Sequence, residues 1–245
     1  MYKALKTIFK GIIPYRFLIK NELVFRRIYA FFYSGNTHQC PVCNKKLSSF
    51  VSVNNKDLLC PNCGSLSRHR RLWETLIKEN ALKGKVLHFS PSRCLYRKLK
   101  KVDGISYFSS DYADEFLADH TYDITNINQP ENAFDTIIAY HILEHIPNDK
   151  RAISELYRVL KPNGKVFIQT PFKAGDIYEN ETITSPAERK EHFGQEDHVR
   201  IYTIEGLKNR LEDADFQVKM TTFKSQENDV FKGFISPETI LIASK

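Results

Sequence analysis

The hydrophobic positions between residues 85 and 170 alternate between short apolar runs and amphipathic stretches. Apolar runs that predict strands occur at residues 85–89, 105–109, 134–139 and 165–170. Residues 95–99 and 153–160 space their leucines and isoleucine as on one face of a helix. Strands that alternate with helices in this way predict an α/β domain with a doubly wound, mostly parallel sheet.

The C-terminal part continues the pattern after a polar gap. Thr203 is placed to cap a helix whose Ile204 and Leu207 share one face, and strand-like runs follow at residues 216–223 and 239–243. Residues 172–202 show neither period and are predicted to be irregular.

The first 34 residues mix apolar and basic side chains. No uncharged stretch approaches the ~18 residues that a membrane span requires. The apolar stretch at residues 11–13 is too short for a cleavable signal peptide. Ile8, Ile12 and Ile19 recur at helical spacing, although Pro14 interrupts it. We therefore expect a basic amphipathic segment that lies in a membrane interface or packs as a helix on the domain.

Positive charge is concentrated in the first third of the chain. Residues 1–85 hold 16 basic and 4 acidic side chains, a net charge of +12, whereas residues 86–245 hold 20 and 25, a net charge of −5. The hydrophobic fraction of 42% and charged fraction of 27% are ordinary for a globular protein and disfavour a disordered or membrane-embedded class. The basic part predicts an anionic partner, a membrane surface or RNA; a solvated basic face is the alternative.

Four cysteines form a candidate metal site. Cys40 and Cys43 make one C-x2-C pair, Cys60 and Cys63 make a second, and 16 residues separate the pairs. This spacing is typical of a four-thiolate zinc ribbon, in which the metal closes the fold and keeps no open position for chemistry. Two disulfides are the alternative, but they need an oxidising compartment, which the lack of a signal peptide disfavours. The sequence predicts a structural Zn²⁺.

A basic run follows the second cysteine pair. Residues 68–71 are Arg, His, Arg and Arg, and Leu72 and Leu76 continue them at helical spacing. We expect these basic side chains to open a helix that links the ribbon to the following domain. They would either hold a phosphate or cap and solvate the junction.

A family resemblance is carried by three consecutive segments. They are Phe134–Pro147 (FDTIIAYHILEHIP), Ile153–Gly164 (ISELYRVLKPNG) and Lys165–Thr170 (KVFIQT). They resemble class I S-adenosylmethionine-dependent methyltransferases, and the likeness extends over about residues 80–245. It implies a Rossmann-like sheet of seven strands with an antiparallel C-terminal hairpin at its edge. The predicted division is a basic segment at 1–36, the zinc ribbon and linking helix at 37–79, and the methyltransferase domain at 80–245.

The resemblance places the cofactor, S-adenosyl-L-methionine, beyond the carboxyl ends of the strands. It implies that the Asp111 carboxylate accepts hydrogen bonds from the ribose hydroxyls and that Asp123 and Ile124 contact the adenine. The alternative for Asp111 is that it only caps the following turn. Residues 88–91 stand where the family usually has a glycine-rich turn and depart from its G-x-G pattern. The predicted cofactor-binding residues are His88, Phe89, Ser90, Pro91, Asp111, Asp123, Ile124, Tyr140 and His141.

The catalytic and acceptor residues are less defined. The His141 imidazole is suited to act as a general base, but we assign it first to the cofactor lining, so that no catalytic base is identified. Glu144 and His145 recur in the wider family as structural features. The predicted substrate-binding residues are His192, Gln195, His198 and Arg200, which would recognise a phosphate, carboxylate or sugar hydroxyls, or instead pin a long loop to the core.

Three functions follow. The leading one is methyl transfer to an oxygen or nitrogen acceptor, such as a glycan or lipid-linked sugar at the cytoplasmic face of a membrane. The second is methylation of ribosomal or transfer RNA, in which the ribbon and basic helix would grip phosphates. The third is a noncatalytic zinc-ribbon binding module whose altered first turn has lost the cofactor. We expect a cytoplasmic protein without a transmembrane span, with a peripheral position at the membrane as one option.

Overall fold

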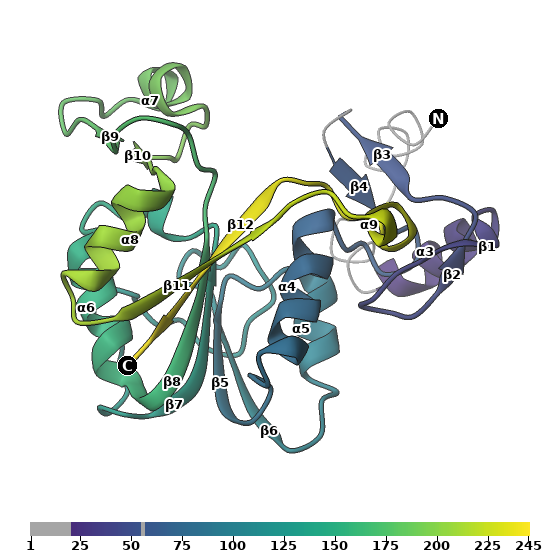
Figure 1. Cartoon of the computed structure of the whole chain (residues 1–245), viewed down its shortest axis with the longest axis horizontal. Coiled ribbons are helices and arrows are strands. Elements are labelled where there is room, and N and C mark those ends of the chain that lie inside the picture. Colours follow the sequence, from purple (N-terminus) through teal and green to yellow (C-terminus); the bar gives the residue numbers. More distant parts are fainter. Residues whose placement is uncertain (1–20, 55–56) are drawn as a thin grey trace. The chain divides into compact units, whose positions relative to one another are not determined.

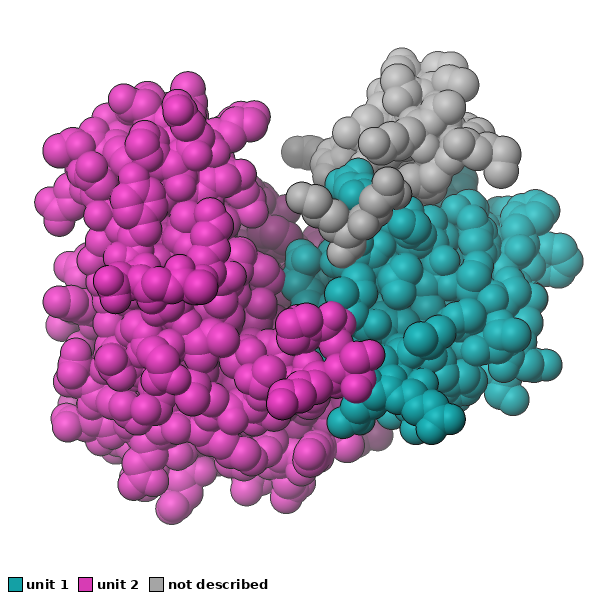
Figure 2. All heavy atoms as spheres, turned by 45° about the horizontal axis from the view of Figure 1, so that its top comes forward, with its two compact units in different colours: residues 1–73, 226–235 teal, residues 74–225, 236–245 magenta. Residues whose placement is uncertain are grey.

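The computed structural model describes residues 21–54 and 57–245, and the chain divides into two compact units (Figure 2). The first unit comprises Met1–Trp73 and Gln226–Ile235, and the second comprises Glu74–Ser225 and Ser236–Lys245. The observed division thus falls after Trp73, inside the helix α4 (Ser67–Lys78), whereas the predicted boundary follows residue 79. A C-terminal segment also belongs to the first unit, which no local pattern in the sequence indicates.

A six-stranded sheet forms the centre of the second unit (Figure 1). Its strands are β5 (Gly84–Phe89), β6 (Ile105–Ser110), β7 (Phe134–Tyr140), β8 (Leu160–Gln169), β11 (Gln217–Phe223) and β12 (Glu238–Ser244). The spatial order is β11-β12-β8-β7-β5-β6, with β5 to β8 parallel and β12 antiparallel to both of its neighbours. This confirms the predicted mostly parallel α/β fold with an antiparallel C-terminal hairpin.

The sheet has one strand fewer than predicted. Between β6 and β7, within the described residues, only an isolated parallel bridge from Ser110 to His120 extends it. Hydrogen bonds hold this stretch as a loop, because the Ser109 carbonyl accepts from the amides of both Asp119 and His120. One carbonyl that serves two successive amides cannot continue a regular ladder, in which the bonds are evenly spaced.

Helices cover both faces of the sheet (Figure 1). The helix α5 (Arg93–Leu99) lies on one face, and α6 (Asp149–Val159) and α8 (Ile204–Glu212) lie on the other. Asn148 caps α6 by accepting from the Arg151 amide, and Thr203 caps α8 by accepting from the Gly206 amide, as predicted for Thr203.

The hydrophobic core of this unit is built between the sheet and the pair α6 and α8. Ile137 of β7 and Val166 of β8 are fully buried, as are Leu156 of α6 and Leu207 of α8. Each such side chain contributes about 1.5–3 kcal/mol by leaving water. This packing fixes β7 and β8, and with them the residues that follow their carboxyl ends.

The segment between β8 and α8 is more ordered than predicted. It contains the helix α7 (Pro186–Phe193) and a two-stranded ladder of β9 (Tyr178–Glu179) and β10 (Arg200–Ile201). Ser185 and Glu188 form a capping box at the start of α7, and Ile183 and Phe193 bury against Ile201. The prediction of an irregular segment is wrong here, because the local signals were short and the small apolar cluster joins residues distant in sequence.

The first unit is built from short elements. They are the helices α3 (Glu22–Phe31) and α9 (Glu227–Lys232), the first turns of α4, and the strands β1 (Ser34–Gln39), β2 (Lys46–Leu47), β3 (Val51–Val53) and β4 (Asp57–Leu59). The strands pair as two separate antiparallel ladders, β1 with β2 and β3 with β4. The predicted amphipathic spacing at residues 8–19 lies outside the described residues. Across residues 21–54 and 57–245, no helix has both the length and the apolar character to cross a membrane.

Candidate functional site

The four predicted cysteine ligands converge in the first unit. Their sulfur atoms lie within 4.8 Å of one another, with Cys40 Sγ 3.7 Å from Cys63 Sγ and Cys43 Sγ 3.8 Å from Cys60 Sγ. Tetrahedral zinc with Zn–S bonds of about 2.3 Å separates its sulfurs by about 3.8 Å. A disulfide needs about 2.0 Å, and all these cysteines are free thiols. The donor set therefore fits a structural zinc and does not fit the disulfide alternative.

Two equivalent turns aim the cysteines at one point. After each C-x2-C pair the backbone enters the left-handed region, at Asn44 (φ 58°) and Gly64 (φ 80°). The amides of these residues donate to the carbonyls of Cys40 and Cys60, at 2.8 and 2.9 Å. Such positive φ values suit asparagine and glycine, which is why these residues follow the second cysteine of each pair.

Polar groups surround the sulfurs and can donate hydrogen bonds to metal-bound thiolates. The Ser65 hydroxyl lies 3.3 Å from Cys40 Sγ and 3.2 Å from Cys63 Sγ, and the Asn62 side-chain amide donates to Cys43 Sγ. The cysteines share protons: hydrogen bonds among the four sulfurs lower the pKa of Cys40 and raise the pKa of Cys60 and Cys63. Thiolates are the form in which cysteine ligates zinc.

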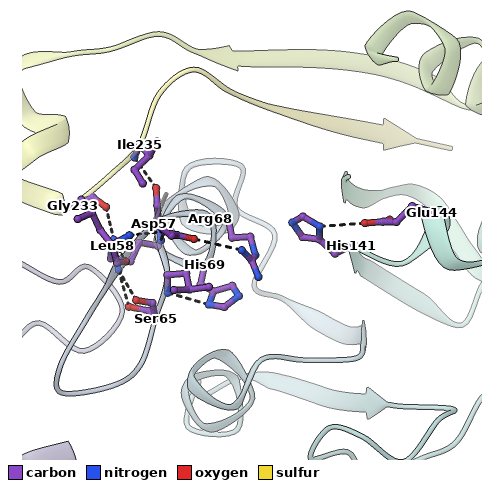
Figure 3. Close-up of polar contacts among 12 residues, drawn as sticks. Asp57, Leu58, Ser65, Arg68, His69, His141, Glu144, Gly233 and Ile235 are labelled. Carbon is purple, nitrogen blue, oxygen red and sulfur yellow. Dashed lines mark hydrogen bonds and ion pairs between the residues drawn. The ribbon is translucent and has the colours of Figure 1, made fainter. Parts of the chain in front are cut away.

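The arginines that follow the ribbon are structural. Arg70 is fully buried and donates to the carbonyls of Ser65, Leu58 and Gly233, which lie together in Figure 3. Its guanidinium also lies 4.3 Å from the centre of the Phe50 ring. Of the two uses predicted for this basic run, phosphate binding is therefore closed to Arg70, whose donors hold the ribbon and the C-terminal segment together.

Arg71 is engaged in the same way. Its guanidinium pairs with Asp229 at 3.3 Å, with both side chains buried, and stacks 3.8 Å from the centre of the Phe234 ring. Arg68 pairs more loosely with Asp57 at 3.5 Å. The helix opening thus anchors the segment 226–235 within the first unit.

In the second unit, the chain turns sharply at the carboxyl end of β5. Ser90 takes a positive φ of 42°, its amide donates to the Ser110 carbonyl, and its hydroxyl donates to Asp111 Oδ1 at 2.7 Å. A serine with positive φ is uncommon, and this one lies in the turn at residues 88–91 that departs from the G-x-G pattern. Pro91 follows it and is buried.

The Asp111 carboxylate is buried and already serves its own loop. Its Oδ2 accepts from the amides of Glu115 and Phe116 at 2.6 and 2.9 Å, while Oδ1 accepts from Ser90. A carboxylate has about four acceptor positions, so one on Oδ1 stays open for a ribose hydroxyl. Of the two roles predicted for this residue, these contacts show the capped turn, and ribose binding stays a prediction.

His88 and Phe89 point away from the strand end. His88 is buried, and its Nδ1 lies 3.1 Å from the hydroxyl of Tyr107 on β6. Burial lowers the pKa of His88 to about 3, so the ring is neutral at pH 7. Phe89 lies in the core cluster. Of the four predicted turn residues, Ser90 and Pro91 are therefore the ones placed past the end of β5.

Asp123 and Ile124 also lie in different surroundings. Ile124 is buried in the core, while Asp123 lines a pocket of about 470 Å³ together with Tyr112, Tyr122 and Asn126. Asp123 Oδ1 accepts from the amide and hydroxyl of Thr125. Of the two residues predicted to contact the adenine, Asp123 thus lines a pocket and Ile124 lies in the hydrophobic core.

Buried polar atoms gather past the carboxyl ends of β7 and β8. Among the described residues, His141 Nε2, Glu144 Oε2, Gln169 Oε1 and Thr170 Oγ1 have no hydrogen-bond partner. His141 takes a positive φ of 55°, and its Nδ1 lies 3.2 Å from Glu144 Oε1, the pair drawn in Figure 3. Unpaired buried polar atoms are costly, and in native proteins they mark ligand or functional positions. Tyr140 precedes this group and is buried.

The four predicted substrate residues lie in different surroundings: two are exposed, one is a buried histidine and one is a buried arginine. His192 is exposed at the end of α7 and hydrogen-bonds Tyr178, and Gln195 is exposed just after it. His198 is buried beside His145, with ring centres 4.7 Å apart. Burial, and then the neighbouring His145, lowers the pKa of His198.

Arg200 is buried and its donors are used within the chain. It donates to the carbonyls of Leu143, Ile146 and Pro147 and to the Glu179 carboxylate. Only one of its five N–H groups is left, so it holds the loop that follows β7. Two roles were predicted for Arg200, recognition of the substrate or attachment of a long loop to the core, and these contacts fit the second.

The sequence reasoning did not select Glu144, Gln169 and Thr170 as site residues. Glu144 was set aside as a structural feature, and Gln169 and Thr170 form the polar end of an apolar run. Polar residues that directly follow a buried parallel strand were the available signal, because ligands bind past the carboxyl ends of such strands.

Comparisons with known proteins identify the family of the domain. The model of a methyltransferase domain family matches residues 70–220. Among solved structures, the chain resembles an S-adenosylmethionine-dependent methyltransferase from Archaeoglobus fulgidus, with 18% identity, 74% of this chain and 95% of that chain covered, and a TM-score of 0.52. It also resembles a phosphoethanolamine N-methyltransferase from Haemonchus contortus, with 15% identity, 66% and 49% covered, and a TM-score of 0.46. No curated protein matches the chain.

Proposed function

Because the chain belongs to the methyltransferase domain family, whose model covers residues 70–220, and is an S-adenosylmethionine-dependent methyltransferase, we propose that it methylates an oxygen or nitrogen atom of a hydroxyl-rich acceptor, a glycan or lipid-linked sugar. The observation that supports this most is the group of unpaired buried polar atoms on His141, Glu144, Gln169 and Thr170. An acceptor rich in hydroxyls supplies the donors and acceptors that the atoms of His141, Gln169 and Thr170 lack.

The cofactor residues follow from the turns at the strand ends. Ser90, Pro91, Asp111 and Asp123 would hold S-adenosylmethionine, with the open acceptor position on Asp111 Oδ1 taking a ribose hydroxyl. When bound, this cofactor supplies a methyl group on a positively charged sulfur. The chain's own task is to place the acceptor atom in line with that methyl group.

His141 is the residue best placed to orient the acceptor. With Nδ1 directed at Glu144, the buried Nε2 has no partner among the described residues and can accept a hydrogen bond from a hydroxyl or amine. That bond would direct the lone pair of the acceptor atom. Its proposed role is thus acceptor positioning as well as the cofactor lining predicted from sequence.

A lipid-linked acceptor is supported by the surface of α3. Phe31 is 75% exposed and Phe32 76% exposed, and Val24 and Ile28 extend the apolar face along the helix. Large apolar side chains in a basic segment are typical of peripheral membrane binding. The RNA hypothesis loses part of its support, because Arg70 and Arg71 are buried in contacts within the first unit.

The acceptor is tested by methyl transfer from labelled S-adenosylmethionine to three pools: a membrane lipid extract, soluble glycans and RNA. We expect label in the lipid-linked sugar fraction, and label confined to RNA would contradict the proposal. Flotation with anionic vesicles should weaken in a Phe31→Ser/Phe32→Ser variant. Val230→Ser, which changes another exposed apolar residue, should float like the wild type.

A further inference from the structure

Three potential metal ligands meet past the carboxyl end of β7. Glu144 and His145 lie in a short 3-10 turn (Leu143–His145), and His198 lies just before β10. One ligand atom from each lies within 4.8 Å of the other two. The two imidazole rings meet edge to face at 88°. Two imidazoles and one carboxylate from two segments are therefore close enough together to share one ion.

Glu144 carries a second, independent sign of a cation. The residue is 1% exposed, and among the described residues its Oε2 has no hydrogen-bond partner. Its Oε1 is held 3.2 Å from His141 Nδ1, which fixes the carboxylate (Figure 3). A buried carboxylate oxygen without a partner costs several kcal/mol unless a positive charge or donor meets it.

His145 has the outer contact that metal-ligating histidines usually have. Asp197 Oδ2 lies 3.0 Å from His145 Nδ1, which leaves the lone pair of Nε2 for a ligand. The His198 ring packs edge to face against His145, which fixes the direction of its imidazole. A carboxylate or carbonyl on the far nitrogen fixes the tautomer and the direction of the ring.

The backbone holds these segments in place without the ion. The Val199 amide donates to the Glu144 carbonyl at 2.9 Å, and Arg200 donates to the Leu143 carbonyl at 3.1 Å. The two ligand-bearing segments are thus tied together directly after His198. A site supported in this way is preorganised, so little ordering is needed when an ion binds.

We propose that Glu144, His145 and His198 bind one divalent first-row transition-metal ion, such as Mn²⁺, Fe²⁺, Co²⁺ or Zn²⁺, distinct from the ion of the cysteine cluster. Two imidazoles with one carboxylate select this class over Mg²⁺ or Ca²⁺, which prefer oxygen ligands throughout. Three protein ligands leave coordination positions open. If the proposed function holds, an acceptor oxygen would bind at one of these open positions. The ion would then lower the pKa of the acceptor hydroxyl.

The test is a titration of the zinc-replete protein with Mn²⁺, in which the electron paramagnetic resonance signal of free Mn²⁺ is followed. Thiolates prefer Zn²⁺, so the cysteine cluster keeps its ion, and zinc content is measured in every sample. We expect one Mn²⁺ per chain in the wild type. Glu144→Gln and His198→Asn should weaken binding by about tenfold or more, and Asp197→Asn by about tenfold to a hundredfold.

Matched controls separate ligand loss from misfolding. His192→Asn changes an exposed histidine of the same segment and should bind Mn²⁺ like the wild type. Glu144→Gln keeps the shape of the side chain, and circular dichroism with zinc content verifies the fold of each variant. Absence of Mn²⁺ and Co²⁺ binding to the wild type at millimolar concentration would overturn the proposal, as would wild-type affinity in folded Glu144→Gln.

Cofactor binding is measured on the same samples. Binding of S-adenosylmethionine without Mn²⁺ binding would refute the metal site and leave the proposed function intact. Methyl label confined to RNA would refute the proposed acceptor, and the metal site would still stand if Mn²⁺ binds.

Discussion

Mild acid should destabilise the second unit through His88. Burial lowers the pKa of this imidazole to about 3, whereas an imidazole in an unfolded chain has a pKa of about 6.5. Between these values the unfolded chain binds the proton and the folded chain does not. The stability contributed by neutral His88 is therefore fully present above pH 6.5 and is lost as the pH falls toward 3.

The size of the effect follows from the two pKa values. Between pH 7 and pH 5, proton linkage at this one residue lowers the free energy of unfolding by about 2 kcal/mol. His88→Gln keeps a side chain that can hydrogen-bond Tyr107 but cannot take up this proton. The variant should therefore lose about 2 kcal/mol less than the wild type over the same interval.

Urea unfolding followed by circular dichroism at pH 7 and pH 5 measures this difference. His192→Gln replaces an exposed histidine and should keep the full pH dependence of the wild type. The pKa of His198 is also lowered by burial, but this contribution is common to the compared proteins and cancels. Equal losses in His88→Gln and the wild type would refute the reasoning.

Two further predictions concern the first unit. Cys60→Ser should remove one thiolate ligand and release the zinc, measured by elemental analysis; full retention of zinc would show that the cysteines are not its ligands. Gly233→Ala should lower the free energy of unfolding by about 2–4 kcal/mol, because φ is 67° and the new Cβ would lie 2.3 Å from the Phe50 ring. Gly104→Ala, with φ 81° and nothing within 4 Å, should cost only the backbone strain of about 1–2 kcal/mol, and equal losses in urea unfolding would contradict the steric argument.

The sheet and the zinc ribbon were predictable because their signals are local. Each buried strand of the second unit carries an apolar run, and the C-x2-C spacing fixes which side chains share a metal. The missing seventh strand was not predictable. It depends on how the Asp111 carboxylate and the Ser109 carbonyl hold the loop after β6, which no periodicity records.

The structure places some of the predicted site residues together past the strand ends and others elsewhere. The rule that ligands bind past the strand ends located Ser90, Asp111 and His141. The positions of the other predicted residues depend on where their side chains point. His88 lies in a strand and points into the interior, and the Arg200 guanidinium donates to backbone carbonyls. The pairing of Glu144 with His198 joins residues 54 positions apart, so no sequence spacing could reveal it.

The C-terminal segment of the first unit could not be predicted from the sequence for a related reason. Arg70 reads as a solvent-exposed charge in a basic run, but its partners include the carbonyl of Gly233 near the other end of the chain. Burial of an arginine is stabilised only when several acceptors converge on it. That convergence belongs to tertiary structure, and it is what adds residues 226–235 to the first unit.

The central claim is that the turns after β5 and β6 hold S-adenosylmethionine. Calorimetric titration of the zinc-replete protein with S-adenosylmethionine and S-adenosylhomocysteine tests it, with Asp111→Ala as the site variant and Asp103→Ala, an exposed acidic residue of the same unit, as the control. We predict binding of both compounds to the wild type and to Asp103→Ala, and loss of binding in Asp111→Ala. A folded wild type that binds neither compound would contradict the account.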